Sequence, residues 1–394
     1  MNYDTLINPV VRDIPPSGIR KFFDIVQKME GAISLGVGEP DFMTPWCIRE
    51  AAIYSIEQGK TQYTANRGAI ELRRAISKYL RDRFSLCYDP VKEILVTVGV
   101  SEGIDVALRA ICGPGDEVLV PDPSYVSYAP GVALAGGKPV AVRTLASEDF
   151  RLRSRDIEAV ITPRTKALIL PYPNNPTGAV MEKKDLEALL PVIIKHDLFV
   201  LSDEVYAELN YGAPHVSIAT LPGMAERTLL LSGMSKALSM TGWRIGYACG
   251  PSQVVSAMVK IHQYVIMCAP NMSQVAACEG LLHEMDNGYP EIMRMRRAYN
   301  RRRRVMLNGF REMGLPCFEP KGAFYCFPSI TGTGLTSEEF CEGLLREEKV
   351  AVVPGTAFGA SGEGHFRACY AVAQDKMEEA LIRIRRYIER LEGK

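Results

Sequence analysis

The chain has 394 residues, which is long for a single hydrophobic core, so we expect a large domain accompanied by a smaller one. Lysine plus arginine and aspartate plus glutamate both number 46, and this zero net charge argues against nucleic acid or an anionic membrane surface as the main partner. Hydrophobic residues make up 47% of the chain and charged residues 23%, which is an ordinary globular composition.

Several classes of protein are disfavoured by motifs that the sequence lacks. The ten cysteines include no C-x-x-C pair and the five histidines show no metal-binding spacing, so we expect reduced thiols and no metal site. Residues 1–16 lack the basic and apolar segments of a signal peptide. No apolar run approaches the roughly 18 residues of a membrane span. We therefore expect a cytoplasmic protein.

Short runs rich in valine, isoleucine and leucine alternate with amphipathic stretches from about residue 90. Such runs are typical of strands covered by helices on both sides, and the stretches between them, such as 101–111 and 183–196, have helical spacing. The pattern predicts an α/β fold with a mainly parallel seven-stranded sheet between helices. The predicted strands are residues 93–99, 116–121, 138–143, 165–173, 198–206, 227–233 and 243–250.

The pattern changes after about residue 290, where a charged helix over 288–312 leads into β-rich segments and a closing amphipathic helix. We predict a smaller α+β domain over residues 291–394. Residues 46–290 would form the large domain, and residues 1–45 an N-terminal arm and part of the small domain. A cleft between two such domains is a common ligand site. The basic run Arg301–Arg304 is interpreted as a solvated helix face.

Polar residues follow several predicted strands, at the edge where an open parallel sheet binds its ligands. The segment Val100-Ser101-Glu102-Gly103 follows the first strand and opens a helix, whose free N–H groups and dipole suit a phosphate. A plain helix cap by Ser101 is the alternative. Asn175, Asp203 and Lys236 follow later strands in the same way.

Asp203 and Lys236 are charged groups at positions where burial is costly without a partner. Taken singly, Asp203 is equally well explained as a helix cap, and Lys236 is better explained as a surface lysine. A desolvated lysine, however, has a lowered pKa and becomes a nucleophilic amine. Together, phosphate donors, an amide, an acid and an amine match a cofactor with a phosphate, a ring oxygen, a ring nitrogen and an aldehyde. That cofactor is pyridoxal 5′-phosphate.

Five segments strongly resemble the class I/II aminotransferases of fold type I, and the resemblance extends over essentially the whole chain. Their order is GVGEPDF (36–42), YTANRGAIELRRAI (63–76), PNNPTG (173–178), SDEVY (202–206) and SGMSKALSMTGWRIGY (232–247). The lysine segment combined with the Asn-Pro-Thr-Gly segment is a very specific signal.

The resemblance implies catalytic roles for three residues. Lys236 would form the internal Schiff base and move a proton between substrate and cofactor. Asp203 would keep the ring nitrogen protonated, and Tyr206, together with Asn175, would hydrogen-bond the ring oxygen.

The resemblance also implies the remaining cofactor contacts. Tyr125 would stack on the ring, although a core tyrosine is the alternative. The phosphate would be bound by the helix start and by three further side chains, in all Val100, Ser101, Glu102 through its backbone, Ser235 and Arg244.

Substrate and subunit contacts follow from the same resemblance. Arg367 would bind the substrate α-carboxylate bidentately beside Asn175, with Gly38 leaving room for the substrate. An exposed edge arginine is the alternative for Arg367. Tyr63 would reach the phosphate of a neighbouring subunit, which implies a homodimer, although ordinary packing also explains a tyrosine there.

Two positions depart from the family pattern. Gly233 stands where many relatives have a serine, which removes one possible phosphate hydroxyl. Tyr172 stands where relatives often have asparagine or serine.

The implied reaction is ping-pong transfer of the amino group of an L-amino acid to a 2-oxo acid such as 2-oxoglutarate. The N-terminal segment most resembles aromatic and broad-specificity aminotransferases, and Ile19, Phe22 and Phe23 are candidates for an apolar side-chain pocket. N-acetyl-diaminopimelate and alanine/aspartate-type aminotransferases remain alternatives.

A C–S β-lyase of the same fold is the alternative from another class. A cofactor-binding regulator is disfavoured because no basic extension is present, and a nucleotide-dependent oxidoreductase because no G-x-G-x-x-G follows the early strands.

Overall fold

The structure is a computed structural model that describes residues 1, 3–16, 18 and 29–393. Its centre is a seven-stranded sheet in which β8 is antiparallel to its two neighbours and the other strands are parallel. The predicted α/β class and all seven predicted strands are confirmed. The spatial order is β2 (Ile94–Thr97), β8 (Gly246–Cys249), β7 (Thr228–Gly233), β6 (Phe199–Asp203), β5 (Thr165–Leu170), β3 (Glu117–Asp122) and β4 (Lys138–Arg143).

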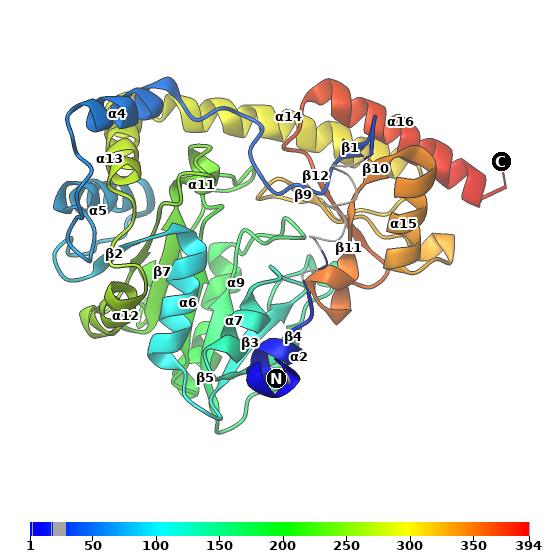
Figure 1. Ribbon diagram of the computed structural model, residues 1–394. Coiled ribbons are helices and arrows are strands. Elements are labelled where there is room, and N and C mark those ends of the chain that lie inside the picture. The colour runs from blue at the N-terminus through cyan, green and yellow to red at the C-terminus, as the bar shows by residue number, and fades with distance from the viewer. Residues whose placement is uncertain (2, 17, 19–28, 394) are drawn as a thin grey trace.

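Helices cover both faces of this sheet, which explains why its strands are apolar on both sides (Figure 1). Along β2, Leu95 packs in a cluster with the apolar side chains of α6 (Gly99–Ile111) and α12 (Ser252–Val265). Ile94 and Val96 point the other way, toward α5 (Ile70–Phe84) and α13 (Asn271–Asp286). Further helices on the sheet are α7 (Tyr128–Leu134) and α8 (Ser154–Glu158), and α4 (Trp46–Glu57) packs on α13.

The helical stretch expected over 183–196 is instead two short helices, α9 (Lys183–Glu187) and α10 (Leu190–Lys195). The break has a local cause, because Pro191 has no N–H to donate to the residue four positions earlier. Proline is tolerated in the first turn of α10, where that N–H is not needed.

A second, smaller unit packs beside the large sheet. It contains a three-stranded sheet in the order β11 (Val353–Pro354), β12 (Phe366–Cys369) and β9 (Tyr325–Cys326). Near the N-terminus, β1 (Ile33–Ser34) pairs with β10 (Val350–Ala351) of this unit. The domain limits at residues 45 and 290 stay a prediction. The helices of the unit are α14 (Pro290–Glu312), α15 (Ser337–Glu348) and α16 (Gln374–Leu391).

Helix α14 runs along one side of the molecule, from the helices of the large sheet to the smaller unit (Figure 1). Its basic run differs from the expected solvated face. Arg301 and Arg304 are exposed, but Arg302 pairs with Asp41 at 2.8 Å and buried Arg303 pairs with Glu319 at 2.9 Å. Half of the run therefore makes tertiary contacts.

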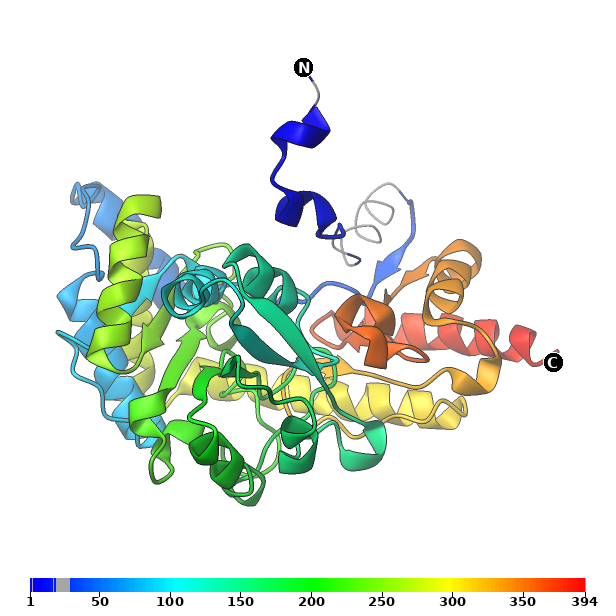
Figure 2. The same ribbon diagram turned by 90° about the horizontal axis from the view of Figure 1, so that it is seen from below.

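The N-terminal helix α1 (Tyr3–Leu6) projects away from the rest of the chain, whereas α2 (Pro9–Asp13) lies near α7 (Figure 2). Among the helices of the described residues, none is long and apolar enough to cross a membrane. The described part of the chain also holds no group of three or more histidine, cysteine, aspartate or glutamate side chains that could bind a metal ion.

Candidate active site

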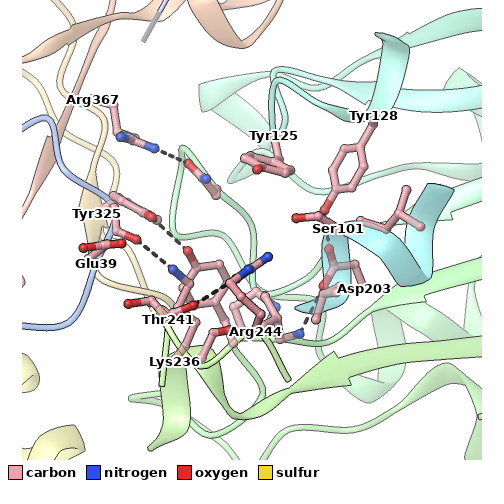
Figure 3. Close-up of a pocket in the computed structure, with 18 of the residues that line it drawn as sticks. Glu39, Ser101, Tyr125, Tyr128, Asp203, Lys236, Thr241, Arg244, Tyr325 and Arg367 are labelled. Atoms are coloured by element: carbon pink, nitrogen blue, oxygen red, sulfur yellow. Dashed lines mark hydrogen bonds between the residues drawn. The ribbon is translucent and has the colours of Figure 1, made fainter. Parts of the chain in front are cut away.

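A cavity of about 520 Å³ opens at the carboxyl ends of β5, β6 and β7 and is closed by residues of the smaller unit. It brings together most of the residues singled out in the sequence, from positions as distant as 38 and 367 (Figure 3). Two of them, Glu102 and Tyr63, do not line it. The predicted residues that line the cavity are Gly38, Val100, Ser101, Tyr125, Asn175, Asp203, Tyr206, Ser235, Lys236, Arg244 and Arg367.

Lys236 lies in the one-turn helix α11 (Met234–Ala237), directly after β7. Its Nζ donates a hydrogen bond to the carbonyl oxygen of Gly38 at 2.7 Å. Burial lowers the pKa of Lys236 to about 8, because desolvation disfavours the ammonium form. About a tenth of the Lys236 side chains are therefore neutral, nucleophilic amines at pH 7, compared with fewer than about one in a thousand at the ordinary lysine pKa of 10.5.

Asp203 ends β6 and is buried in the cavity wall. One carboxylate oxygen accepts a hydrogen bond from the hydroxyl of Tyr128 at 2.8 Å, and the other accepts one from the N–H of Val205 at 3.2 Å. Burial raises the pKa of Asp203 to about 6, and these donors only partly oppose the increase. A carboxylate held by neutral donors is well suited to receive a cationic group of a ligand.

Arg367 is 2% exposed, because β12 is the middle strand of its sheet. The interpretation as an exposed edge arginine is therefore wrong. Its guanidinium lies between the rings of Tyr325 and Phe358, at 4.4 and 4.8 Å from their centroids. One terminal nitrogen donates to Oδ1 of Asn175 at 2.8 Å and the other to the carbonyl of Gly36 at 2.6 Å. Within the described part of the chain, buried Nε has no partner, so the group has capacity for an anionic ligand.

Tyr325 connects the lysine side of the cavity to Arg367. Its hydroxyl is 2.8 Å from that of Tyr206. A Cβ atom at position 38 would lie 2.6 Å from the same hydroxyl. Glycine is thus required at position 38 by the close approach of Tyr325, in addition to the room that it leaves for a ligand.

The opposite end of the cavity is suited to an anion. Helix α6 begins at Gly99, whose φ of +73° favours glycine, and a Cβ atom there would overlap the guanidinium of Arg244. Arg244 itself is exposed and donates to the carbonyl of Thr241 at 3.0 Å. The helix cap is Val98, so Ser101 lies inside the first turn and the plain-cap interpretation of Ser101 is wrong.

The two departures from the family pattern have packing explanations. A Cβ atom on Gly233 would lie 2.9 Å from both the Cα of Gly246 and the carbonyl of Ile245, because β7 and β8 approach closely there. Tyr172 is buried and donates to the carbonyl of Phe150 at 2.8 Å.

Two predicted residues do not line the cavity of this chain, and a third prediction cannot be placed. The side chain of Tyr63 is 80% exposed. The side chain of Glu102 turns away from the cavity toward His262 and the N–H of Val98. The apolar candidates Ile19, Phe22 and Phe23 lie outside the described residues.

Other lining residues were missed by the sequence analysis, chiefly Tyr128, Tyr325, Glu39 and Thr241. Only Glu39 carries a local signal, since it directly follows Gly38 and a charged residue beside a required glycine is a candidate. Tyr128 and Tyr325 have the spacing of core residues, and their hydroxyls reach the site through contacts 75 and 119 residues apart in sequence.

Comparison with known proteins matches residues 30–384 to the family model "Aminotransferase class I and II". The chain belongs to this family. It is 52% identical to "Putative aminotransferase YugH" of Bacillus subtilis, over 98% of each chain. It is 47% identical to "Aspartate aminotransferase" of Pyrococcus abyssi, over 95% of this chain and 96% of that one.

A solved aminotransferase structure supports the same assignment. The aromatic aminotransferase of Pyrococcus horikoshii is 45% identical, with a TM-score of 0.90, over 94% of this chain and 99% of that one. The enzyme is therefore an aminotransferase with the expected mainly parallel sheet and smaller domain.

Class I and II aminotransferases depend on pyridoxal 5′-phosphate, and the cavity of this aminotransferase fits that cofactor. A partly buried lysine with a pKa of about 8 suits an aldehyde, and a buried acid suits a protonated ring nitrogen. The glycine start of α6 beside Arg244 suits a phosphate. The buried Nε of Arg367 leaves capacity for a substrate carboxylate.

Proposed function

We propose that this aminotransferase moves the amino group of an aromatic or other neutral L-amino acid to a 2-oxo acid such as 2-oxoglutarate. The observation that supports this substrate class is the set of charged side chains that line the cavity. Among its described lining residues, the arginines are Arg244 and Arg367, whose proposed partners are the cofactor phosphate and the substrate α-carboxylate. Glu39 adds a negative charge, and Tyr125 and Ile104 add apolar surface. A second carboxylate on the substrate side chain therefore meets no further arginine from these residues.

The proposed chemistry follows from the positions of four side chains. Pyridoxal phosphate supplies an aldehyde that captures the amino group and a ring that accepts electrons. Arg367 binds the α-carboxylate and so orients the Cα–H bond. Lys236, as a neutral amine, would remove the Cα proton from the substrate and would later deliver a proton to the cofactor. With the cofactor bound, Asp203 would favour a proton on its ring nitrogen, and the Tyr206 hydroxyl would donate to its ring oxygen.

The phosphate is proposed to bind at the helix start and its neighbours. The backbone of Val100, Ser101 and Glu102 would supply N–H donors, and the side chains of Ser101, Ser235 and Arg244 would complete the set. Tyr125 would pack against the ring.

We further propose a homodimer, in which Tyr63 completes the phosphate site of the partner. Support comes from large apolar side chains left exposed in the single chain, including Met43 at 76%, Tyr63 at 80% and Tyr264 at 87%. Light scattering of the purified enzyme would give twice the mass of the chain. Tyr63→Phe would weaken cofactor binding without changing that mass.

An aspartate-type donor is the second candidate, because the Pyrococcus abyssi relative at 47% identity is named an aspartate aminotransferase. Such a donor would need a cation from outside the described lining residues, for example from a partner subunit. The N-acetyl-diaminopimelate and alanine alternatives are tested by the same experiment.

The test is a half-reaction screen. The purified enzyme with its cofactor is mixed with single amino acids, and the loss of the cofactor's visible absorbance gives a rate for each one. Phenylalanine and tyrosine reacting faster than aspartate would support the proposal, and the reverse order would contradict it. Lys236→Ala is the control and would abolish the reaction. Release of pyruvate and ammonia from cystathionine without any oxo acid would instead identify the C–S lyase.

A further inference from the structure

A buried pair of side chains lies behind the wall of the cavity, at the start of helix α6. Nδ1 of His262, on α12, is 2.6 Å from Oε1 of Glu102. Since a carboxylate only accepts, the imidazole Nδ1–H donates. The His262 side chain is fully buried and that of Glu102 is 13% exposed. Neither residue lines the cavity.

The other oxygen of Glu102 acts on the backbone of the helix start. Oε2 accepts the N–H of Val98 at 2.5 Å, and Val98 is the residue that caps α6. The residues preferred at a helix cap are serine, threonine, aspartate and asparagine, whose side chains accept the N–H of the second or third helical residue. Valine cannot do this, so the N–H groups of Val100 and Ser101 are not consumed by a cap side chain.

His262 is oriented through this contact. Its second ring nitrogen, Nε2, is buried without a hydrogen-bond partner in the part of the chain that the structure describes. Glu102 is therefore the partner that holds the ring, and the ring in turn holds the carboxylate against the N–H of Val98. The two contacts link α12 to the first turn of α6 across 160 residues of sequence.

We propose that Glu102 and His262 are positioning residues for the cofactor phosphate. Glu102 fixes the backbone of Val98, the residue before the helix, so that the N–H groups of Val100 and Ser101 point toward the same anion. The Val98 side chain forms no hydrogen bond with these groups, so they remain free to bind the phosphate. The proposal rests on the proposed binding of pyridoxal phosphate at the start of α6. It adds a role for the side chain of Glu102, of which only the backbone was assigned to the phosphate.

The test compares two probes that differ only in the phosphate. Apoenzyme is titrated with pyridoxal 5′-phosphate and with pyridoxal, and absorbance and protein fluorescence give both dissociation constants. Glu102→Ala and His262→Leu should weaken binding of the phosphorylated probe at least about tenfold, because hydrogen bonds that position charged ligands are strong. Binding of pyridoxal should change less than about twofold. A general loss of structure would weaken the binding of both probes equally.

Control variants separate positioning from mere charge and packing. Asp105→Ala removes the same charge one turn further along α6, where Asp105 pairs with Arg109, and should leave both constants unchanged. His262→Asn keeps an N–H donor near Nδ1 and should restore most of the affinity. If His262→Leu does not fold, Glu102→Ala carries the test alone, since its side chain is not part of a hydrophobic cluster.

Two negative results have different meanings. If the unmodified apoenzyme does not prefer pyridoxal phosphate over pyridoxal, the phosphate site under the proposed function is wrong. If it does prefer the phosphate, and Glu102→Ala keeps the same preference, the positioning role alone is overturned.

Discussion

Replacing Asp203 by asparagine should stabilise the aminotransferase without its cofactor while removing most of its activity. Burial raises the pKa of this carboxyl from 3.8 to about 6 in the folded chain. The folded state therefore prefers the neutral acid. The stabilising contribution of Asp203 is fully present below about pH 4 and is lost as the pH rises through about 6. Asparagine has nearly the same shape and is neutral at every pH.

The magnitude follows from the difference in pKa. A shift of about two units corresponds to about 3 kcal/mol at pH 7, since each unit is worth about 1.4 kcal/mol. The entropy of unfolding is about 2 cal/mol/K per residue, so a chain of this length gains about 3–4 °C in melting temperature. The predicted gain disappears near pH 4, where Asp203 is neutral too.

The assay is thermal unfolding of the two apoenzymes at equal protein concentration between pH 4 and pH 8. Asp13→Asn is the matched control, because the Asp13 side chain is 68% exposed and the substitution removes the same charge. Turnover of the loaded enzyme is measured alongside. Asp203→Asn should lose activity because the ring nitrogen loses its anionic partner.

Equal melting temperatures for Asp203→Asn and the unmodified apoenzyme at pH 7 would refute this reasoning. It would mean that the hydrogen bonds from Tyr128 and Val205 compensate the buried charge fully. A gain that persists unchanged at pH 4 would refute it as well, since titration of Asp203 could not then be its cause.

Three further outcomes are expected. Cofactor should associate with apoenzyme faster as the pH rises, with a midpoint near pH 8, because burial lowers the pKa of Lys236 to about 8 and only the neutral amine attacks an aldehyde. Stopped-flow absorbance would show this profile, and a midpoint near the ordinary lysine value of 10.5 would contradict it. Tyr325→Phe removes the hydroxyl bonded to Tyr206 but keeps the ring that contacts Arg367. Steady-state kinetics should show kcat/KM falling about three- to tenfold, and unchanged kinetics would show that the hydroxyl has no role. Gly233→Ser should lower the free energy of unfolding by about 1–3 kcal/mol in denaturant unfolding, because the added Cβ would lie 2.9 Å from backbone atoms of Ile245 and Gly246. A more stable variant would show that β8 can shift to accommodate the side chain.

Much of the fold could be read from local pattern. Strands buried on both faces are continuous apolar runs, and all seven were located to within a few residues. The motifs around Asn175, Asp203 and Lys236 occur at strand ends, where an open parallel sheet binds ligands, so their meeting in one cavity was predictable. The break of the 183–196 helix at Pro191 was equally local and could have been expected.

Long-range contacts could not be obtained in this way. The burial of Arg367, the contact of Tyr128 with Asp203, and the pairing of Glu102 with His262 join segments that are 75 to 192 residues apart. A periodic pattern reports which face of an element is buried and which chemical group a position carries. It contains no information on which distant side chain is the hydrogen-bond partner of a given residue. Those partners follow from how the layers pack, and they set the pKa of Asp203, the orientation of Arg367 and the shape of the proposed phosphate site.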